Sequence, residues 1–297
     1  MPSANSTASI SRSLRTFGCV AALAIFPLTL AATGPTHLEK TVDATDDPEI
    51  SLNNLRGQIV IHGWEKSQVH VICNTATPRV EVDVEAFPKT GRAERLQFNA
   101  HAMDPLVTAN DETADCTFDV PVNASLEVRN RQGSVVIDGL QGQHASVESA
   151  NAKVSASDVS SHLTARTMGG DIEVVRASGR VEVYSITGSL RFADTTSKNL
   201  RGNTNSGAII YKGDFVPAGE YILSTYSGNI EIILPPSASF ELNAKTVKGK
   251  VENTFSLTPK RHSSSPFPSA NSLLGTYNTG NATVEVTSFS GRIRVHQ

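Results

Sequence analysis

Two glutamates are the residues whose type and spacing best suit catalysis. Glu231 and Glu252 occupy the same outward position in consecutive copies of a repeated pattern. If the copies stack, the two carboxylates would lie about 5 Å apart, the separation of a retaining glycosidase pair. Asp171 and Glu173 similarly fall beside Arg191 in this alignment. Charged side chains of both signs populate any solvated face, so we favour a mixed-charge surface over an active site.

The other reactive side chains form no catalytic or metal-binding motif. The eight histidines are scattered, and no pair has metal-ligand spacing on one helix or strand. The chain has neither a Gly-any-Ser-any-Gly nucleophile elbow nor a glycine-rich phosphate loop. We therefore expect no catalytic residue, no metal and no cofactor.

Two places could bind a ligand. His62 lies close to Trp64, the single tryptophan of the chain, in a polar setting. This pair could bind a ligand, or Trp64 could pack over the end of the repeat as part of a cap, which we favour.

The second place is the column that follows the Ser/Thr/Asn position of each repeat. Tyr226 and Phe289 are its binding candidates. The column is more apolar than an exposed corner requires, so it either packs at the corner or forms an apolar stripe open to a partner. We favour packing. The column reads Leu55, Arg131, Ala150, Met168, Ile186, Asn205, Tyr226, Val247 and Phe289.

The element that must position these residues is the repeat itself. Its pattern is apolar, any, apolar, any, Ser/Thr/Asn, any, any, Gly, any, apolar, any, apolar, and it is plainest in residues 163–174 and 181–192. A first copy occurs at residues 50–61, and Ala152 replaces the glycine of one later copy. The predicted turn ladder comprises Asn130 with Gly133, Thr167 with Gly170, Ser185 with Gly188, Thr204 with Gly207, Thr225 with Gly228, Thr246 with Gly249 and Ser288 with Gly291.

Each part of the pattern has a physical cause. Apolar residues at every second position direct one face of each strand toward a common interior. The glycine permits a positive φ, and the Ser or Thr hydroxyl can bond to nearby backbone in the turn. A unit of about 20 residues cannot bury its face alone, but stacked units can. The pattern therefore predicts an all-β, single-stranded β-helix, or solenoid, with rungs of about 20 residues.

The breaks in the pattern suggest the domain organisation. Residues 1–31 resemble a signal peptide, with a basic start and an apolar stretch, although an uncleaved anchor would look similar. Residues 32–49 are a polar lead-in, 50–122 hold the first rung and an N-terminal β cap, and 123–297 form the solenoid. Residues 253–280, rich in Pro and Ser, are predicted to be a flexible excursion, and the final strands to dock as the last coil.

Export and cysteine usage agree. Cys19 would leave with the signal, so Cys73 and Cys116 remain, and we predict that they form a disulfide. Such a loop closure stabilises the folded state by about 4 kcal/mol. Two buried free thiols are the alternative.

The sequence resembles a bacterial family of unknown function known as the putative-adhesin family. The segment 234–251, beginning Leu-Pro-Pro-Ser-Ala, and the segment 120–128, followed by Gly133-Ser134-Val135, look like its recurring signature. The resemblance implies a right-handed β-helix on an exported protein and carries no catalytic residues.

Three functions are open. We favour an exported, non-enzymatic adhesin, surface-binding or envelope scaffold module that recognises a cell-surface, glycan or protein ligand in the periplasm, on the cell surface or outside the cell. After signal cleavage we expect no transmembrane segment. The alternatives are a polysaccharide lyase or hydrolase and a ligand-sensing accessory of an envelope signalling system. The formal net charge of −3 and the lack of a basic stripe argue against nucleic acid.

Overall fold

The computed structural model describes residues 36–103, 112–260 and 271–297, which form strands and no helix. The chain divides into Met1–Ala32 and Thr33–Gln297, and the second unit holds all described residues. The predicted signal segment and Cys19 lie outside them. In the described part, no helix is long and apolar enough to cross a membrane.

The strands are β1 (Thr36–Trp64), β2 (Gln68–Thr75), β3 (Val80–Phe87), β4 (Ala93–Ala102), β5 (Ala114–Pro121), β6 (Ser125–Asp138), β7 (His144–Ser157), β8 (His162–Thr167), β9 (Ile172–Val175), β10 (Val181–Ser185), β11 (Leu190–Ala193), β12 (Asn199–Thr204), β13 (Ile209–Lys212), β14 (Glu220–Thr225), β15 (Ile230–Ile233), β16 (Phe240–Thr246), β17 (Val251–Asn253), β18 (Thr258–Pro259), β19 (Ser272–Tyr277), β20 (Ala282–Ser288) and β21 (Ile293–His296).

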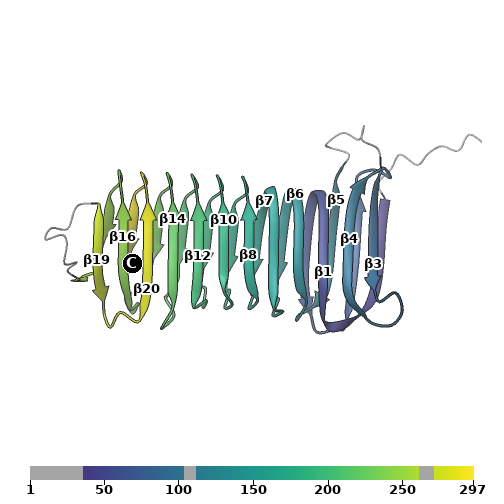
Figure 1. Ribbon diagram of the computed structural model, residues 1–297, viewed down its shortest axis with the longest axis horizontal. Coiled ribbons are helices and arrows are strands. Elements are labelled where there is room, and N and C mark those ends of the chain that lie inside the picture. The colour runs from purple at the N-terminus through teal and green to yellow at the C-terminus, as the bar shows by residue number, and fades with distance from the viewer. Residues whose placement is uncertain (1–35, 104–111, 261–270) are drawn as a thin grey trace, which may run out of the picture. The chain divides into compact units, whose positions relative to one another are not determined.

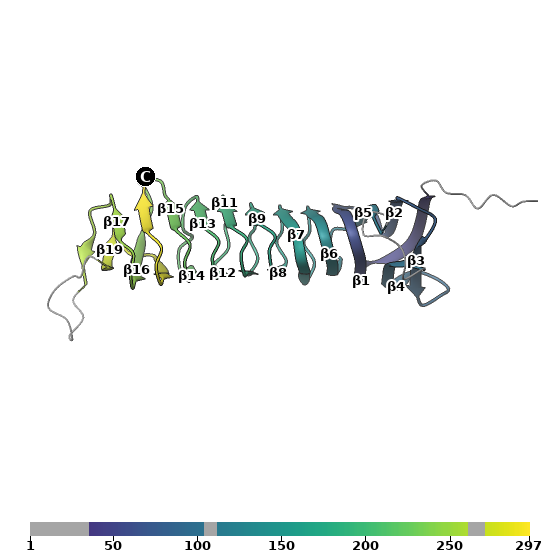
Figure 2. The same ribbon diagram turned by 90° about the horizontal axis from the view of Figure 1, so that it is seen from above.

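The repeat folds into coils that stack in parallel. Each central coil has one strand before its glycine corner and one after it. β8, β10, β12 and β14 pair in one parallel row, and β9, β11, β13 and β15 pair in a second. Val181 pairs with Leu163 of the preceding coil and with Leu200 of the following one. Within the second unit, Figures 1 and 2 show these rows as a β-solenoid.

The core follows from strand alternation. Val181, Val183, Leu190 and Phe192 point inward and are at most 1% exposed. Full burial of a side chain of this size contributes about 1.5–3 kcal/mol. Because every coil adds several such residues to one continuous core, stacking stabilises coils that could not fold alone.

Most corner glycines are required for a reason other than the predicted one. Gly57 and Gly133 have positive φ angles of +121° and +114°. Gly188 and the later ladder glycines are not in that region, so the prediction of a positive φ is wrong for them. A Cβ on Gly188 would lie 1.9 Å from the carbonyl oxygen of Gly170. Close approach between coils therefore demands glycine there.

The corner without glycine keeps its place in the stack. Ala152 pairs with Gly133 within the continuous β6–β7 register. Its backbone N–H donates to the Ser149 Oγ at 2.7 Å, as the glycines do in other corners. The rung is therefore regular despite the substitution.

The final coil does not dock last. β20 lies between β14 and β16, and β21 lies between β15 and β17. The coil of β16 and β17 is thus displaced outward by the coil that follows it in sequence (Figure 1). The expectation of a terminal last coil is wrong, because stacking depends on edge pairing and not on chain order.

The excursion is partly ordered. β19 pairs antiparallel with β16, and β18 pairs antiparallel with β19. Phe255 and Tyr277 contact Phe240 at this end, with ring centroids 5.5 and 5.6 Å away. The prediction of flexibility is therefore wrong for these strands, because their apolar residues close the end of the core. Residues 261–270 lie outside the described part.

Antiparallel strands also cover the N-terminal end of the stack. The second half of β1 pairs with β6 on one side and with β4 and β5 on the other. β2 pairs antiparallel with β5, and β3 with β4. Cys73 and Cys116 face each other across β2 and β5, with Cα atoms 4.2 Å apart, and form the predicted disulfide.

Candidate functional site

A ladder of buried hydroxyls underlies one corner of the solenoid. Thr204 Oγ1 accepts a hydrogen bond from the Gly207 N–H at 3.2 Å and donates to the Gly188 carbonyl at 3.0 Å. Each hydroxyl thus joins its own corner to the preceding one in the stack. The same double contact occurs at Thr167, Ser185, Thr225, Thr246 and Ser288, although at Thr167 the accepting carbonyl is that of Ala150. The backbone polar groups of these corners are satisfied internally, which provides a rigid base for the side chains beside them.

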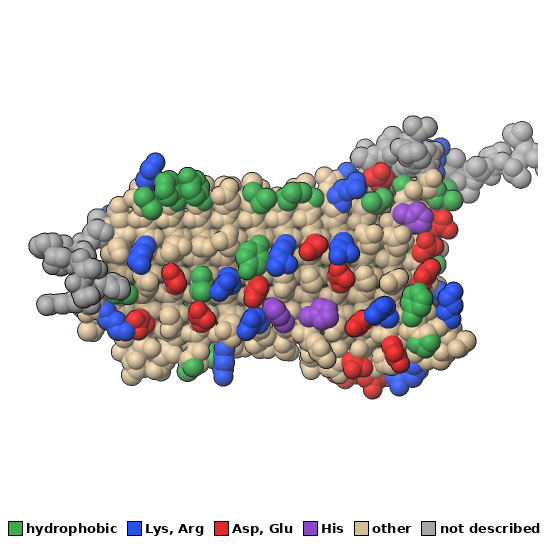
Figure 3. Space-filling view, in the orientation of Figure 1, with side chains coloured by type: hydrophobic (Ala, Val, Ile, Leu, Met, Phe, Trp, Pro, Cys, Tyr) green, Lys and Arg blue, Asp and Glu red, His purple; other side chains and the backbone are tan. Residues whose placement is uncertain are grey.

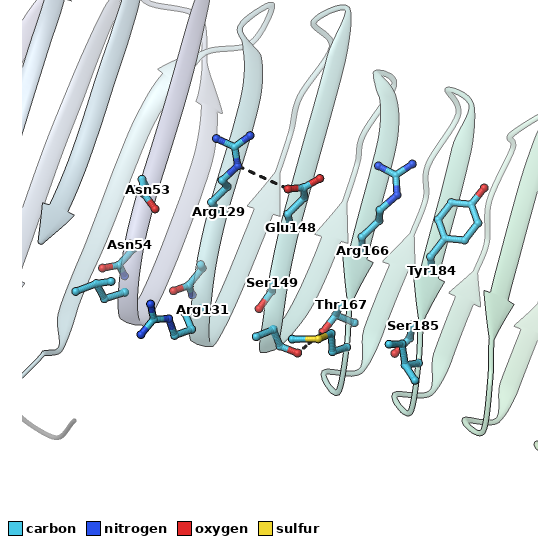
Figure 4. Close-up of a pocket in the computed structure, with 15 residues that line it drawn as sticks. Asn53, Asn54, Arg129, Arg131, Glu148, Ser149, Arg166, Thr167, Tyr184 and Ser185 are labelled. Carbon is cyan, nitrogen blue, oxygen red and sulfur yellow. Dashed lines mark hydrogen bonds and ion pairs between the residues drawn. The ribbon is translucent and has the colours of Figure 1, made fainter. Parts of the chain in front are cut away.

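A groove of about 630 Å³ runs over this ladder across the coils of β1, β6, β7, β8 and β10. One wall is the column that precedes the ladder position, and the other is the column that follows it. The first wall consists of Asn53, Arg129, Glu148, Arg166 and Tyr184. The second consists of Leu55, Arg131, Ala150, Met168 and Ile186. Figure 4 shows Arg129, Glu148, Arg166 and Tyr184 in one row, with Arg131 on the other side of the ladder.

The groove is basic, with one carboxylate already committed. Arg129 is paired with Glu127 at 2.5 Å and with Glu148 at 3.6 Å. The Arg166 guanidinium lies 5.3 Å from the centre of the Tyr184 ring. Among the described residues, neither Arg131 nor Arg166 has a carboxylate partner. Two guanidinium groups therefore remain available to an anionic ligand.

Four apolar side chains of the column that follows the ladder are exposed. Met168 is 55% exposed, Ile186 49%, Tyr226 57% and Val247 61%. This exposure contradicts our preference for packing at Met168, Ile186 and Val247, whereas Tyr226 packs one face of its ring on Phe289. Hydrophobic side chains gather along one edge of the face in Figure 3. The alternative of an apolar stripe describes this column better.

The aromatic candidates belong to the opposite half of that column. Tyr226 and Phe289 stack with ring centroids 4.7 Å apart and an interplanar angle of 2°. The Lys248 ammonium lies 5.2 Å from the centre of the Phe289 ring. Each ring therefore covers one face of the other, and Lys248 lies over Phe289, while Tyr226 remains 57% exposed.

The glutamate pair is not assembled as expected. The inserted strand β21 places Arg294 between the two carboxylates, in register with Glu231 on one side and Glu252 on the other. Arg294 lies 3.9 Å from Glu231 and 3.4 Å from Glu252. The predicted separation of one rung is therefore wrong, and each carboxylate faces an arginine instead of its counterpart.

The charges around Glu252 also disfavour an acid role. Partial desolvation raises its pKa, but Arg292, Arg294 and Lys250 outweigh this and hold the pKa below its usual value. A general acid in glycoside hydrolysis needs the opposite shift. Glu252 therefore behaves as one member of an ion-pair network.

The other acidic cluster is a surface of mixed charge. Glu173 lies 3.9 Å from Arg191 and 3.8 Å from Lys153. Asp171 accepts a hydrogen bond from the Ser189 backbone N–H at 2.8 Å. Figure 3 shows acidic and basic side chains interspersed over this kind of face. Both carboxylates therefore have charged or hydrogen-bonding partners within the chain, as expected for a surface of mixed charge.

The structure does not join His62 to Trp64. Trp64 donates from its indole N–H to the Gln68 carbonyl at 2.7 Å and stacks near His70, with ring centroids 6.3 Å apart. Hydrogen bonds with Glu39 and Asp119 raise the pKa of His70. Trp64 thus belongs to the cap, and within the described residues His62 has no side-chain partner. Over the same part of the chain, no group of three or more His, Cys, Asp or Glu residues could hold a metal ion.

Comparison with known families identifies the relatives of this solenoid. The sequence model of the Toastrack DUF4097 family matches residues 48–296. The chain belongs to this family. The match spans the coil of β1, the cap and all later coils, so the whole described repeat carries the family signature. No curated protein matches the chain.

Several solved structures resemble the chain. A "putative cell adhesion protein" from Clostridium sporogenes is 14% identical, with 89% of this chain and 99% of that chain covered and a TM-score of 0.28. A "putative adhesin" from Bacteroides fragilis is 10% identical, with 88% and 97% covered and a TM-score of 0.32. Another from Parabacteroides distasonis is 10% identical, with 88% and 96% covered and a TM-score of 0.30. These names apply to the solved proteins and do not identify a ligand of this chain.

One wall of the groove was not predicted from the sequence. It is the column before the ladder, where Arg129, Arg166 and Tyr184 lie, whereas the predicted candidates lie in the column after it. The signal was available, because these residues hold equivalent positions in successive copies. Only stacking shows that two columns on either side of a buried hydroxyl form the walls of one groove.

Proposed function

We propose that the chain is an exported, non-enzymatic adhesin-like module that binds a ligand of the cell surface or envelope. The observation that carries this proposal is the groove over the ladder, which combines exposed arginines with exposed apolar side chains on a rigid backbone. Exposed apolar surface rimmed by polar groups is typical of a binding site. Family membership supports the same conclusion.

The finer features of the fold and its location are part of the proposal. We expect a right-handed coil of about 20 residues per turn, a cap over residues 50–122 and a solenoid over 123–297. Export through a signal at residues 1–31 would place the disulfide between Cys73 and Cys116 in an oxidising compartment, where such bonds persist.

Binding without cleavage is the expected result of a direct test. The purified protein is incubated with isolated envelope preparations and with a panel of polysaccharides, and both retained protein and new reducing or unsaturated ends are measured. We expect retention on the envelope preparation and no new chain ends. Cleavage that Glu231→Gln or Glu252→Gln abolishes would instead establish a lyase or hydrolase.

Export is tested separately. The full chain is expressed with a C-terminal tag, and its compartment and N-terminal residue are determined by fractionation and mass spectrometry. We expect the protein outside the cytoplasm with its first 31 residues removed. A cytoplasmic protein with an intact N-terminus would refute this part of the proposal.

A further inference from the structure

Arg131 and Arg166, which have no carboxylate partner within the described residues, define the chemistry of the groove. Arg131 projects from β6 and Arg166 from β8, and both side chains are exposed. Guanidinium groups recognise carboxylate, sulfate or phosphate groups through paired hydrogen bonds. Arg129 lies in the same wall as Arg166 and is already paired with Glu127 and Glu148. The ligand therefore carries anionic groups that can reach both arginines.

Their spacing along the stack favours an extended ligand. β6, β7 and β8 are consecutive neighbours, so Arg131 and Arg166 are two coils apart along the stack. At about 4.8 Å per coil, their offset along the stack is roughly 10 Å, and the two side chains reach the groove from opposite walls (Figure 4). One sugar of an extended glycan spans about the length of one coil step, so two anionic groups two sugars apart would match the arginines.

The apolar wall suits sugar rings. Met168 and Ile186 are about half exposed and lie on consecutive coils beside the ladder. The C–H faces of successive sugars can cover such side chains and remove them from water, while their charged substituents reach the arginines. One groove thereby offers both kinds of contact at the same repeat distance.

An extended peptide fits the same surface less well. Its side chains on one face repeat every two residues, about 6.8 Å, which does not match a coil step of about 4.8 Å. A peptide strand also gains affinity by pairing with a free sheet edge. Here the strands under the groove pair with neighbours on both sides, so no edge is available.

We infer that this groove binds a linear acidic polysaccharide that lies along the stack, with acidic groups two sugars apart bound by Arg131 and Arg166. The inference rests on the proposed binding function and specifies its ligand class. The apolar column holds the sugar rings, and the Tyr184 ring supports the Arg166 guanidinium (Figure 4).

Hyaluronan oligosaccharides, which carry a carboxylate on every second sugar, are the test ligand. Dextran is the neutral control and poly-glutamate the peptide control. Arg131→Gln and Arg166→Gln are each expected to weaken hyaluronan binding about tenfold, as loss of a charge-assisted hydrogen bond does. Arg201→Gln is the matched control, because Arg201 is an exposed arginine on β12 outside the groove.

The outcomes separate the alternatives. Selective binding of hyaluronan that falls in the two groove variants and not in Arg201→Gln supports the inference. Binding unaffected by both substitutions, equal binding of dextran, or equally sensitive binding of poly-glutamate overturns it. Equal melting temperatures of the variants show that the fold is retained.

Failure here is distinct from failure of the proposed function. If the protein binds envelope preparations but not hyaluronan, the ligand class is wrong and the binding function stands. If it fails to bind the preparations and cleaves polysaccharides, the proposed function itself is wrong.

Discussion

The corner column changes its character along the solenoid. Near β6, β8 and β10 it borders an open groove, where Arg131 has no carboxylate partner among the described residues and Ile186 is half exposed. Near β14, β20 and β16 the same column places Tyr226 on Phe289 and Lys248 over the Phe289 ring. In the first half the side chains border an open groove, whereas in the second Tyr226 and Phe289 stack on each other while Tyr226 stays 57% exposed.

Both halves have the same corner hydrogen bond, in which a buried Thr hydroxyl accepts from the backbone N–H of the corner glycine. Thr167 with Gly170 supports the groove half, and Thr225 with Gly228 supports the aromatic half, with hydrogen bonds of 2.9 and 3.0 Å. The difference between the halves therefore comes from the side chains and from the coil order that brings Phe289 beside Tyr226. A repeat with a uniform backbone can hold binding and structural surfaces at equivalent positions.

The largest effect is expected from a substitution that damages this shared backbone. In Gly188→Val and Gly228→Val, the added Cβ would lie 1.9 and 1.8 Å from a carbonyl oxygen of the preceding coil. We expect each to lower the free energy of unfolding by about 3 kcal/mol or more. Denaturant titration measures this loss, and Ser227→Ala at the exposed corner is the control. A large loss of unfolding free energy in only one of the two variants would show that the corner backbones of the two halves are not equivalent.

A smaller loss is expected from the ladder between the halves. Thr204→Val removes one hydrogen bond accepted from Gly207 and one donated to Gly188, and leaves both backbone groups buried. The expected cost is about 2 kcal/mol, since unsatisfied buried polar groups are expensive. Thermal and denaturant unfolding measure it. Thr204→Ser should recover most of the stability, and an equal loss in both variants would show that the methyl group contributes as much as the hydroxyl.

The smallest effects should distinguish the two halves directly. Tyr226→Ser and Phe289→Ser each remove a stacked ring and should cost about 1 kcal/mol of stability without changing hyaluronan binding. Ile186→Ser should change stability by less than about 0.5 kcal/mol and weaken binding. A double-mutant cycle for Tyr226 and Phe289 isolates their coupling. Loss of hyaluronan binding in Tyr226→Ser or Phe289→Ser would show that the ligand binds at the aromatic half and not in the groove.

The sequence did not predict the distance between the two candidate catalytic glutamates correctly. Glu231 and Glu252 occupy equivalent positions in copies that are consecutive in sequence, and this predicted adjacent carboxylates. The structure inserts Arg294 between them, from a coil later in the chain. The stacked pair Tyr226 and Phe289 arises from the same insertion, between residues 63 positions apart. The insertion that separates the carboxylates thus creates the aromatic contact.

The sequence by itself determined the coil: its alternating strands, its buried hydroxyl and its corner glycine. These features depend on residues close together in the chain, because side-chain alternation and corner hydrogen bonds are local. Only the tertiary structure decided which coils are neighbours and why most corner glycines are needed. Every coil presents nearly the same backbone edge, so strand pairing satisfies hydrogen bonds equally well for several orders of stacking. Side-chain packing across coils selects one order, and that order places the arginines, the carboxylates and the aromatic rings.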